Sequence, residues 1–179
     1  MTTQSEQLAE QFETANNEFI ALIERLDDRQ WQANCPAEGW TVGVGANHLA
    51  WGHAALADAI KNVGNGTQAG LTMEMLEQMN AQEATQSASA MKGEVLAKLR
   101  SNGATAADTI RSFTDAELEK FDLLPENHPV RVLDGMPEKA TVRDWIELVI
   151  MPHFREHGSS TLAAAYPALA ASKTPAHVS

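Results

Sequence analysis

The sequence has 179 residues, of which 44% are hydrophobic and 21% are charged, as is typical of a soluble globular domain. Its 24 acidic and 13 basic side chains give a formal net charge of −11, which argues against a nucleic-acid partner or an anionic membrane surface. The single cysteine, Cys35, excludes an internal disulfide and a cysteine-built metal cluster. We expect one domain over 1–179, with its core over about 5–165 and a frayed tail over about 168–179.

The N-terminal residues are polar and acidic, whereas a signal peptide would be basic and then apolar. No apolar run approaches the roughly 20 residues that span a bilayer. These features predict a cytoplasmic protein without a membrane-spanning helix.

Two long helices are predicted in the first third of the chain. The first begins after Ser5, a candidate N-cap, and extends to about Asp28, with apolar residues at alternating steps of four and three. The second begins after Thr41, whose hydroxyl can cap it, and ends near Asn62. The inward stripe expected for this second helix consists of Val44, His48, Gly52, Ala55 and Ala59.

The middle of the chain is less regular. A short helix is expected after Thr72, whereas 81–90 has no clear pattern, and a third long helix is expected over about 89–113. Thr114 and Glu117 form a capping-box pattern that predicts a further short helix. Three prolines lie within 122–140, and we expect this segment to be a loop.

The fourth long helix is predicted from Thr141 to about Ala165, with Asp144 at the position of a capping acid. Its expected stripe is Val142, Ile146, Val149, His153, His157, Ser160 and Thr161. No segment alternates convincingly like a strand. The sequence therefore predicts an all-α four-helix bundle with long connections and extra short helices.

Three of the six histidines fall on the expected inward stripes. His153 and His157 are four residues apart, which places their Cβ atoms about 5–6 Å from one another on a helix. His48 lies on another inward face and supplies a third imidazole. Because unpartnered imidazoles are costly to bury, the pattern favours a shared divalent cation. Three neutral ligands leave a coordination position open, as in catalytic sites.

The other histidines are not expected at this site. His53 lies about 140° around the helix from His48, and we expect it at an edge or in solvent. His128 and His177 are expected at the surface, in the proline-rich loop and in the tail.

Two short motifs resemble those of a known group of proteins. Trp40-Thr41-Val42 followed by His48-Leu49 resembles the Trp-Ser/Thr-Val…His-Leu signature of the DinB-like (DinB/YfiT) superfamily, and His153-x-x-x-His157 resembles its second motif. The segments 79–82 and 94–118 resemble the branch related to the N-terminal domain of mycothiol-dependent maleylpyruvate isomerase. The resemblance extends over about 5–165.

This resemblance implies a bundle with zinc, nickel or a similar divalent ion on His48, His153 and His157. It also implies use of a low-molecular-weight thiol, a small-molecule substrate and a homodimer. Two features depart from the pattern. Gly43, Gly45 and Gly52 make the second helix more pliable than the pattern needs, and Pro152 should kink the fourth helix beside His153.

Residues 153–157 also read as HxxEH, the inverted zinc-peptidase motif, in which Glu156 would be the general base. That enzyme type needs an acidic ligand downstream, and the 22 residues after His157 include no Asp or Glu. Glu156 is therefore only a weak catalytic candidate, and a solvent-facing residue is the alternative.

Trp51 is expected to line the pocket because it lies three residues after His48, whereas Trp40 is expected to pack at the end of the bundle. Asn80 is a weak pocket candidate, with a helix cap as the alternative. Cys35 is expected to be a small packed apolar residue.

The leading hypothesis is a metal-dependent enzyme, either a thiol-dependent transferase or isomerase acting on a small electrophile, or a hydrolase that activates water. The alternatives are a binding protein that keeps the metal without turnover, and a structural bundle whose histidines hold no metal.

Overall fold

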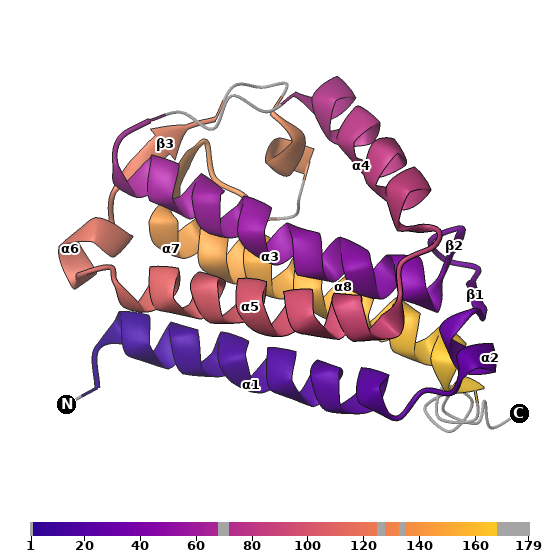
Figure 1. The fold of residues 1–179 in the computed structure, drawn as a ribbon. Helices are drawn as coiled ribbons and strands as arrows, with labels where there is room; N and C mark the ends of the chain where they lie inside the picture. The colour runs from indigo at the N-terminus through magenta and orange to yellow at the C-terminus, as the bar shows by residue number, and fades with distance from the viewer. Residues whose placement is uncertain (1, 68–71, 125–127, 133–134, 168–179) are drawn as a thin grey trace, which may run out of the picture.

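The computed structural model describes residues 2–67, 72–124, 128–132 and 135–167, and four long helical segments lie side by side in it (Figure 1). They are α1 (Gln4–Glu24), α3 (Val42–Gly64), α5 (Lys92–Arg111) and a continuous run made of α7 (Val142–Asp144), η2 (Trp145–Ile150) and α8 (Met151–Ala165). This arrangement confirms the predicted four-helix bundle. No helix within the described ranges is both long and apolar enough to cross a membrane.

The connections between the long helices contain short elements. They are α2 (Asp28–Trp31), β1 (Asn34–Cys35), β2 (Trp40–Thr41), α4 (Met73–Ser87), α6 (Asp115–Leu118), β3 (Phe121–Leu123), η1 (Pro129–Val132) and β4 (Lys139–Thr141). β1 pairs antiparallel with β2, and β3 pairs antiparallel with β4. The prediction of a loop over 122–140 without strands is therefore wrong, because strands of two or three residues are too short to show an alternating pattern.

Both two-stranded sheets determine where a long helix begins. β2 runs directly into α3, and β4 runs directly into α7. At four of the predicted helix starts, a threonine hydroxyl accepts a hydrogen bond from the backbone N–H three residues later; these residues are Thr41, Thr72, Thr114 and Thr141. The first helix differs from its prediction, since Thr3 rather than Ser5 is its cap and it ends at Glu24.

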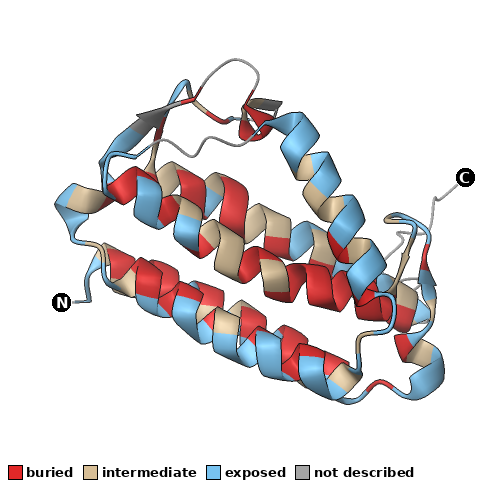
Figure 2. Ribbon diagram, turned by 45° about the horizontal axis from the view of Figure 1, so that its top comes forward, coloured by how far each residue is buried: buried red, intermediate tan, exposed pale blue. Residues whose placement is uncertain are grey.

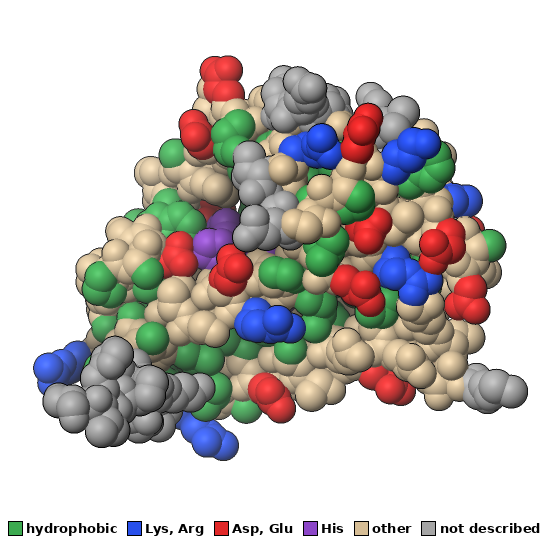
Figure 3. All heavy atoms as spheres, turned by 180° about the vertical axis from the view of Figure 1, so that it is seen from behind, with side chains coloured by type: hydrophobic (Ala, Val, Ile, Leu, Met, Phe, Trp, Pro, Cys, Tyr) green, Lys and Arg blue, Asp and Glu red, His purple; other side chains and the backbone are tan. Residues whose placement is uncertain are grey.

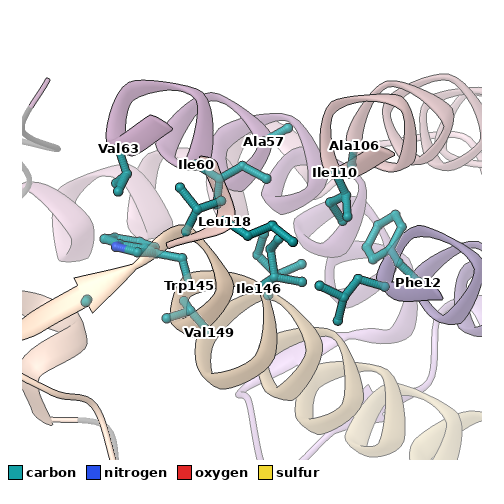
Figure 4. Packing of buried hydrophobic residues seen from close by; sticks show 14 of the residues in the cluster. Phe12, Ala57, Ile60, Val63, Ala106, Ile110, Leu118, Trp145, Ile146 and Val149 are labelled. Atoms are coloured by element: carbon teal, nitrogen blue, oxygen red, sulfur yellow. The ribbon is translucent and has the colours of Figure 1, made fainter. Parts of the chain in front are cut away.

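The core lies between the inner faces of the long helices (Figures 2 and 4). One cluster contains Phe12, Ile60, Ile110, Trp145 and Ile146. A second cluster, toward the other end of the bundle, contains Phe19, Leu49, Leu99 and Phe154. Each such side chain contributes about 1.5–3 kcal/mol when it is fully buried.

The first half of α3 is buried on all sides, from Val42 to Ala50. In its second half the buried face contains His53, Ala57 and Ile60, whereas Ala55 and Ala59 are only half-buried. In the second half of α3, the predicted inward face is therefore rotated about the helix axis relative to the face that is buried. Consequently His53 is only 3% exposed, and the prediction that it lies at an edge or in solvent is wrong.

The fourth helical run contains a π-helical segment, η2, which ends two residues before Pro152. A π turn holds more residues than an α turn, and proline supplies no N–H to the preceding turn. The predicted stripe is correct before this point. After it, Thr161 is buried as predicted, but the other buried residues, Phe154, Gly158 and Ala165, do not belong to the predicted stripe. His153 and His157 lie beside that face and are half-buried.

His128 is also buried, with 3% of its surface exposed, and its ring lies 5.8 Å from that of Trp145. The prediction of a surface position is therefore wrong, because the loop that carries His128 packs against the bundle. His177 lies outside the described residues.

Candidate metal centre

Three histidines from two helices meet near the middle of the bundle. His48 projects from α3, and His153 and His157 project from α8. The Nε2 atoms of His48 and His153 are 3.2 Å apart, and one ring nitrogen of each histidine lies within 4.8 Å of the others. The three residues predicted from the sequence are thus brought together, and histidine side chains reach the surface in a hollow on the back of the molecule (Figure 3).

Two glycines of α3 allow α8 to approach this closely. A Cβ atom on Gly52 would lie 2.9 Å from Cε1 of His153, and one on Gly45 would lie 2.5 Å from Oγ1 of Thr161. Both distances are shorter than a carbon atom tolerates. The sequence suggested that these glycines make the helix pliable, whereas the structure shows that they are needed for close packing against α8.

His48 has a carboxylate beside its other ring nitrogen. Its Nδ1 lies 3.5 Å from Oε2 of Glu83, a residue of α4. Burial by itself would raise the pKa of Glu83, but the adjacent His48 ring and the hydrogen bonds from Ser87 and Asn47 together hold that pKa below its usual value. Glu83 is therefore an anion that faces the outer edge of the His48 ring.

His157 has a similar partner. Its Nδ1 is 3.0 Å from Oε1 of Glu38, which also accepts a 2.6 Å hydrogen bond from the hydroxyl of Ser160. A carboxylate on one ring nitrogen favours the tautomer that leaves the other nitrogen free to bind a metal. Two of the three histidines are thus oriented in the way that metal ligands commonly are.

Two tryptophans border the cluster, and both are half-buried. The ring of Trp40 lies 5.0 Å from that of His48 and stacks at 6.4 Å on that of His157. The ring of Trp51 is 6.3 Å from that of His48, and its role in lining a pocket stays a prediction. Trp40 was expected only to pack at the bundle end, and the structure instead places it against two of the histidines.

The protonation state of His153 suits cation binding. Burial and, to a smaller extent, repulsion from His157, His48 and His53 together lower the pKa of His153 to about 3. His153 is therefore neutral at physiological pH and has a lone pair to offer. His53 is also neutral, because burial lowers its pKa to about 4, but its Nε2 is 3.1 Å from Oδ1 of Asn16 and it belongs to the core.

The donor set was compared with what a tetrahedral ion requires. Two imidazole nitrogens at about 2.05 Å from one zinc ion lie roughly 3.3 Å apart. The separation between His48 and His153 is 3.2 Å, which fits. The ligand nitrogens of the three histidines all lie within 4.8 Å of one another, so small side-chain movements would bring all three rings to one ion. The cluster could therefore hold a divalent metal.

The remaining candidates lie outside this cluster. Glu156 is exposed, which matches the solvent-facing alternative. Asn80 is half-buried in α4, one turn before Glu83, and its Oδ1 has no hydrogen-bond partner among the described residues. Cys35 is buried, and its Sγ lies 3.4 Å from the carbonyl oxygen of Ser160, as expected for a packed residue.

Sequence reasoning missed both carboxylates. Glu38 could have been found, because it lies two residues before Trp40 in the first motif. No sequence pattern pointed to Glu83 as a histidine partner, because it lies in the segment 81–90, which has no hydrophobic periodicity.

Residues 12–148 match the family described as the mycothiol maleylpyruvate isomerase N-terminal domain. Among solved structures, the chain is similar to YfiT from Bacillus subtilis, described as a probable metal-dependent hydrolase with an unusual four-helix bundle topology. The sequence identity is 18% and the TM-score is 0.70, over 93% of this chain and 88% of that chain. This likeness shows a shared fold. The comparison with curated proteins gives no significant match.

Proposed function

The chain belongs to the mycothiol maleylpyruvate isomerase N-terminal domain family, and from this premise we propose that it is a metal-dependent enzyme. In this proposal His48, His153 and His157 hold one divalent ion. Imidazole ligands suit zinc and nickel, among other metals, and these two are the preferred candidates. The observation that carries the proposal is the convergence of three histidines, two of which have a carboxylate at the outer ring nitrogen.

A divalent ion on three neutral imidazoles has an open position at which a thiol or a water becomes a stronger acid. The chain's own residues prepare this position. Glu38 and Glu83 orient two of the rings, and burial keeps His153 neutral. Trp40 and Trp51 form apolar walls on which a small organic substrate can pack.

We favour a thiol over water as the nucleophile. Both carboxylates beside the cluster are engaged with histidines, and the described residues place no acid within the cluster itself. A thiol has an ordinary pKa near 8.5 and needs only a small decrease to ionise, whereas water needs a far larger one. The reaction class is then thiol-dependent transfer to, or isomerisation of, a small electrophile, as the family's description also suggests.

A hydrolase is the second candidate. It is supported by the fold shared with YfiT, whose description is that of a probable metal-dependent hydrolase. The two candidates differ in their need for a thiol, because only the transferase or isomerase requires one for turnover.

Metal content tests the proposal first. Wild-type protein loaded with zinc or nickel and then desalted should retain about one ion per chain. His48→Ala, His153→Ala and His157→Ala should each lose it, whereas Arg155→Ala, an exposed change between the two histidines of α8, should keep it. A wild-type chain that retains no divalent ion contradicts the proposal.

Turnover then separates the reaction classes. The loaded protein is incubated with maleylpyruvate or another small unsaturated acid, with and without mycothiol or cysteine. Thiol-dependent consumption supports the transferase or isomerase, and thiol-independent cleavage of small esters or amides supports the hydrolase. Retention of metal with neither activity favours a binding protein without turnover.

A further inference from the structure

The helix α4 has an unusual attachment to the bundle. Its only buried residues are Glu83 and Ser87, whereas its apolar side chains Met73 and Met75 are exposed. In Figure 2 its surface is mostly exposed or intermediate, in contrast to the inner faces of the long helices. Leu76, Met79 and Ala84 are only half-buried. The fully covered contacts of α4 are therefore polar, because no apolar residue of this helix is buried.

These contacts form a small buried network with α3. Nδ2 of Asn47 donates to Oε1 of Glu83 at 2.7 Å and lies 2.6 Å from Oγ of Ser87. The hydroxyl of Ser87 in turn donates to the same Glu83 oxygen at 2.6 Å. Lys98 of α5 donates to Oδ1 of Asn47 at 3.2 Å. One oxygen of Glu83 thus accepts from Asn47 of α3, which attaches α4 to the bundle, and from Ser87 of α4 itself.

The second oxygen of Glu83 faces a metal-centre residue. Oε2 of Glu83 and Nδ1 of His48 are 3.5 Å apart, both are buried, and neither has another hydrogen-bond partner among the described residues. This distance is longer than that of a normal hydrogen bond. Because an unsatisfied buried polar atom is costly, each of these two atoms is the natural partner of the other.

The tautomer of His48 decides whether they can pair. The 3.2 Å contact between Nε2 of His48 and Nε2 of His153 needs one proton, which either ring can supply. If His48 supplies it, its Nδ1 presents a lone pair to the Glu83 carboxylate, which is unfavourable. A cation bound to Nε2 leaves the proton on Nδ1, which then donates to Glu83.

On the basis of the proposed metal centre, we propose that Glu83 is a positioning residue that couples metal binding at His48 to the docking of α4. Binding of the ion strengthens the contact between His48 and Glu83, and so holds α4 more firmly against α3. By thermodynamic reciprocity, the docked helix increases the affinity of the centre for metal by the same factor. Outer carboxylates of this kind commonly change metal affinity by about tenfold to a hundredfold.

Hydrogen–deuterium exchange of the full chain, with zinc and with a chelator, tests the coupling. In wild-type protein, zinc should slow amide exchange around Glu83 by about tenfold or more. Glu83→Gln keeps the shape of the side chain and an oxygen for Asn47 and Ser87, but removes the charge that faces His48. This variant should lose the zinc-dependent slowing, and its zinc affinity, measured against a chromophoric chelator, should fall by a factor of the same order.

Two control variants separate coupling from simple loosening of the helix. Glu77→Gln removes an exposed acid of the same helix and should behave as the wild type. Ser87→Ala removes the hydrogen bond between Asn47 of α3 and Ser87 of α4, which does not face His48; it should speed exchange with and without zinc while the ratio of the two rates is kept. This variant also keeps the test valid if Glu83→Gln folds poorly.

The outcomes distinguish this inference from the proposed function. The coupling is contradicted if zinc binds the wild type stoichiometrically without changing amide exchange in α4. It is also contradicted if amide exchange in Glu83→Gln depends on zinc as in the wild type. Either result leaves the proposed metal centre intact. A wild-type chain that binds no zinc or other divalent ion overturns both.

Discussion

The Nε2 atoms of His48 and His153 lie 3.2 Å apart, although 105 positions separate the two residues in the chain. They can meet because Gly52 has no side chain where α3 passes the His153 ring. The metal centre thus depends on a helix contact that only small residues permit, and this dependence leads to several expected outcomes.

Removal of the metal should lower the melting temperature. A ligand at one hundred times its dissociation constant adds about 2.7 kcal/mol to the folded state. For a chain of this length, such a change corresponds to a shift of roughly 5–10 °C. Thermal melts with and without a chelator measure it, and His157→Ala should show no chelator effect. Identical melts of zinc-loaded and chelated wild-type protein would instead identify a structural bundle that holds no metal.

The change Gly52→Ala should weaken metal binding more than it weakens the fold. Its new Cβ would lie 2.9 Å from Cε1 of His153 and push that ring out of place. We expect at least about a tenfold loss of zinc affinity, comparable to the loss of an orienting partner.

Gly93→Ala is the matched control for this change. No atom lies within 4 Å of the position of its added Cβ, so zinc affinity should not change. Stability should rise by about 0.4–1 kcal/mol, because alanine restricts the unfolded chain more than glycine does. Equal zinc affinities for both variants would show that the close approach at Gly52 is unimportant for the centre.

The change Glu38→Gln should weaken metal binding by about tenfold to a hundredfold, because it removes the negative charge that orients His157. Ser160→Ala should have a smaller effect, since Ser160 only holds the Glu38 carboxylate. Competition with a chromophoric chelator measures both variants.

Glu156→Gln removes an exposed acid from the same helix and should leave zinc affinity unchanged. If zinc affinity fell in Glu156→Gln but was unchanged in Glu38→Gln, the assignment of Glu38 as the partner of His157 would be wrong.

Stability should fall with pH below about 6.5 because of His53. Burial lowers its pKa in the folded state to about 4, whereas the unfolded chain protonates it near its ordinary value of 6.5. Between these two pH values the unfolded state binds more protons, so the free energy of unfolding decreases as pH decreases. The largest possible contribution of this residue is about 3 kcal/mol.

Urea unfolding at pH 7.5 and pH 4.5 measures this effect, with a chelator present so that loss of metal does not contribute. The change His53→Gln keeps a polar partner for Asn16 and should make the pH dependence shallower. A pH dependence as steep in His53→Gln as in the wild type would assign the effect to other groups.

The four long helices and two of their four starts could be predicted because their signals are local. A threonine at a cap bonds a backbone N–H only three residues away, as at Thr41 and Thr141. The pairing of His153 with His157 follows likewise from the pitch of a single helix. The short strands β1 to β4 escaped prediction because two or three residues carry no periodic signal.

The rotation of each helix about its axis is not a local property, and here the predictions failed. In α3, small apolar residues on several faces left the inward face ambiguous, and His53 was expected at an edge or in solvent although it is buried. In the fourth run, the π-helical segment lies before Pro152, and beyond it Phe154 is buried whereas His153 is only half-buried.

The sequence by itself determined a four-helix bundle and a candidate set of three histidines, since both follow from spacings within single helices. Only the tertiary structure decided which carboxylates serve those histidines. Glu38 lies in a turn and contacts His157, which is 119 positions away in the chain. Glu83 lies in α4 and faces His48, which is about 35 positions away. Such contacts arise from the packing of separate segments, and no spacing along the chain encodes them.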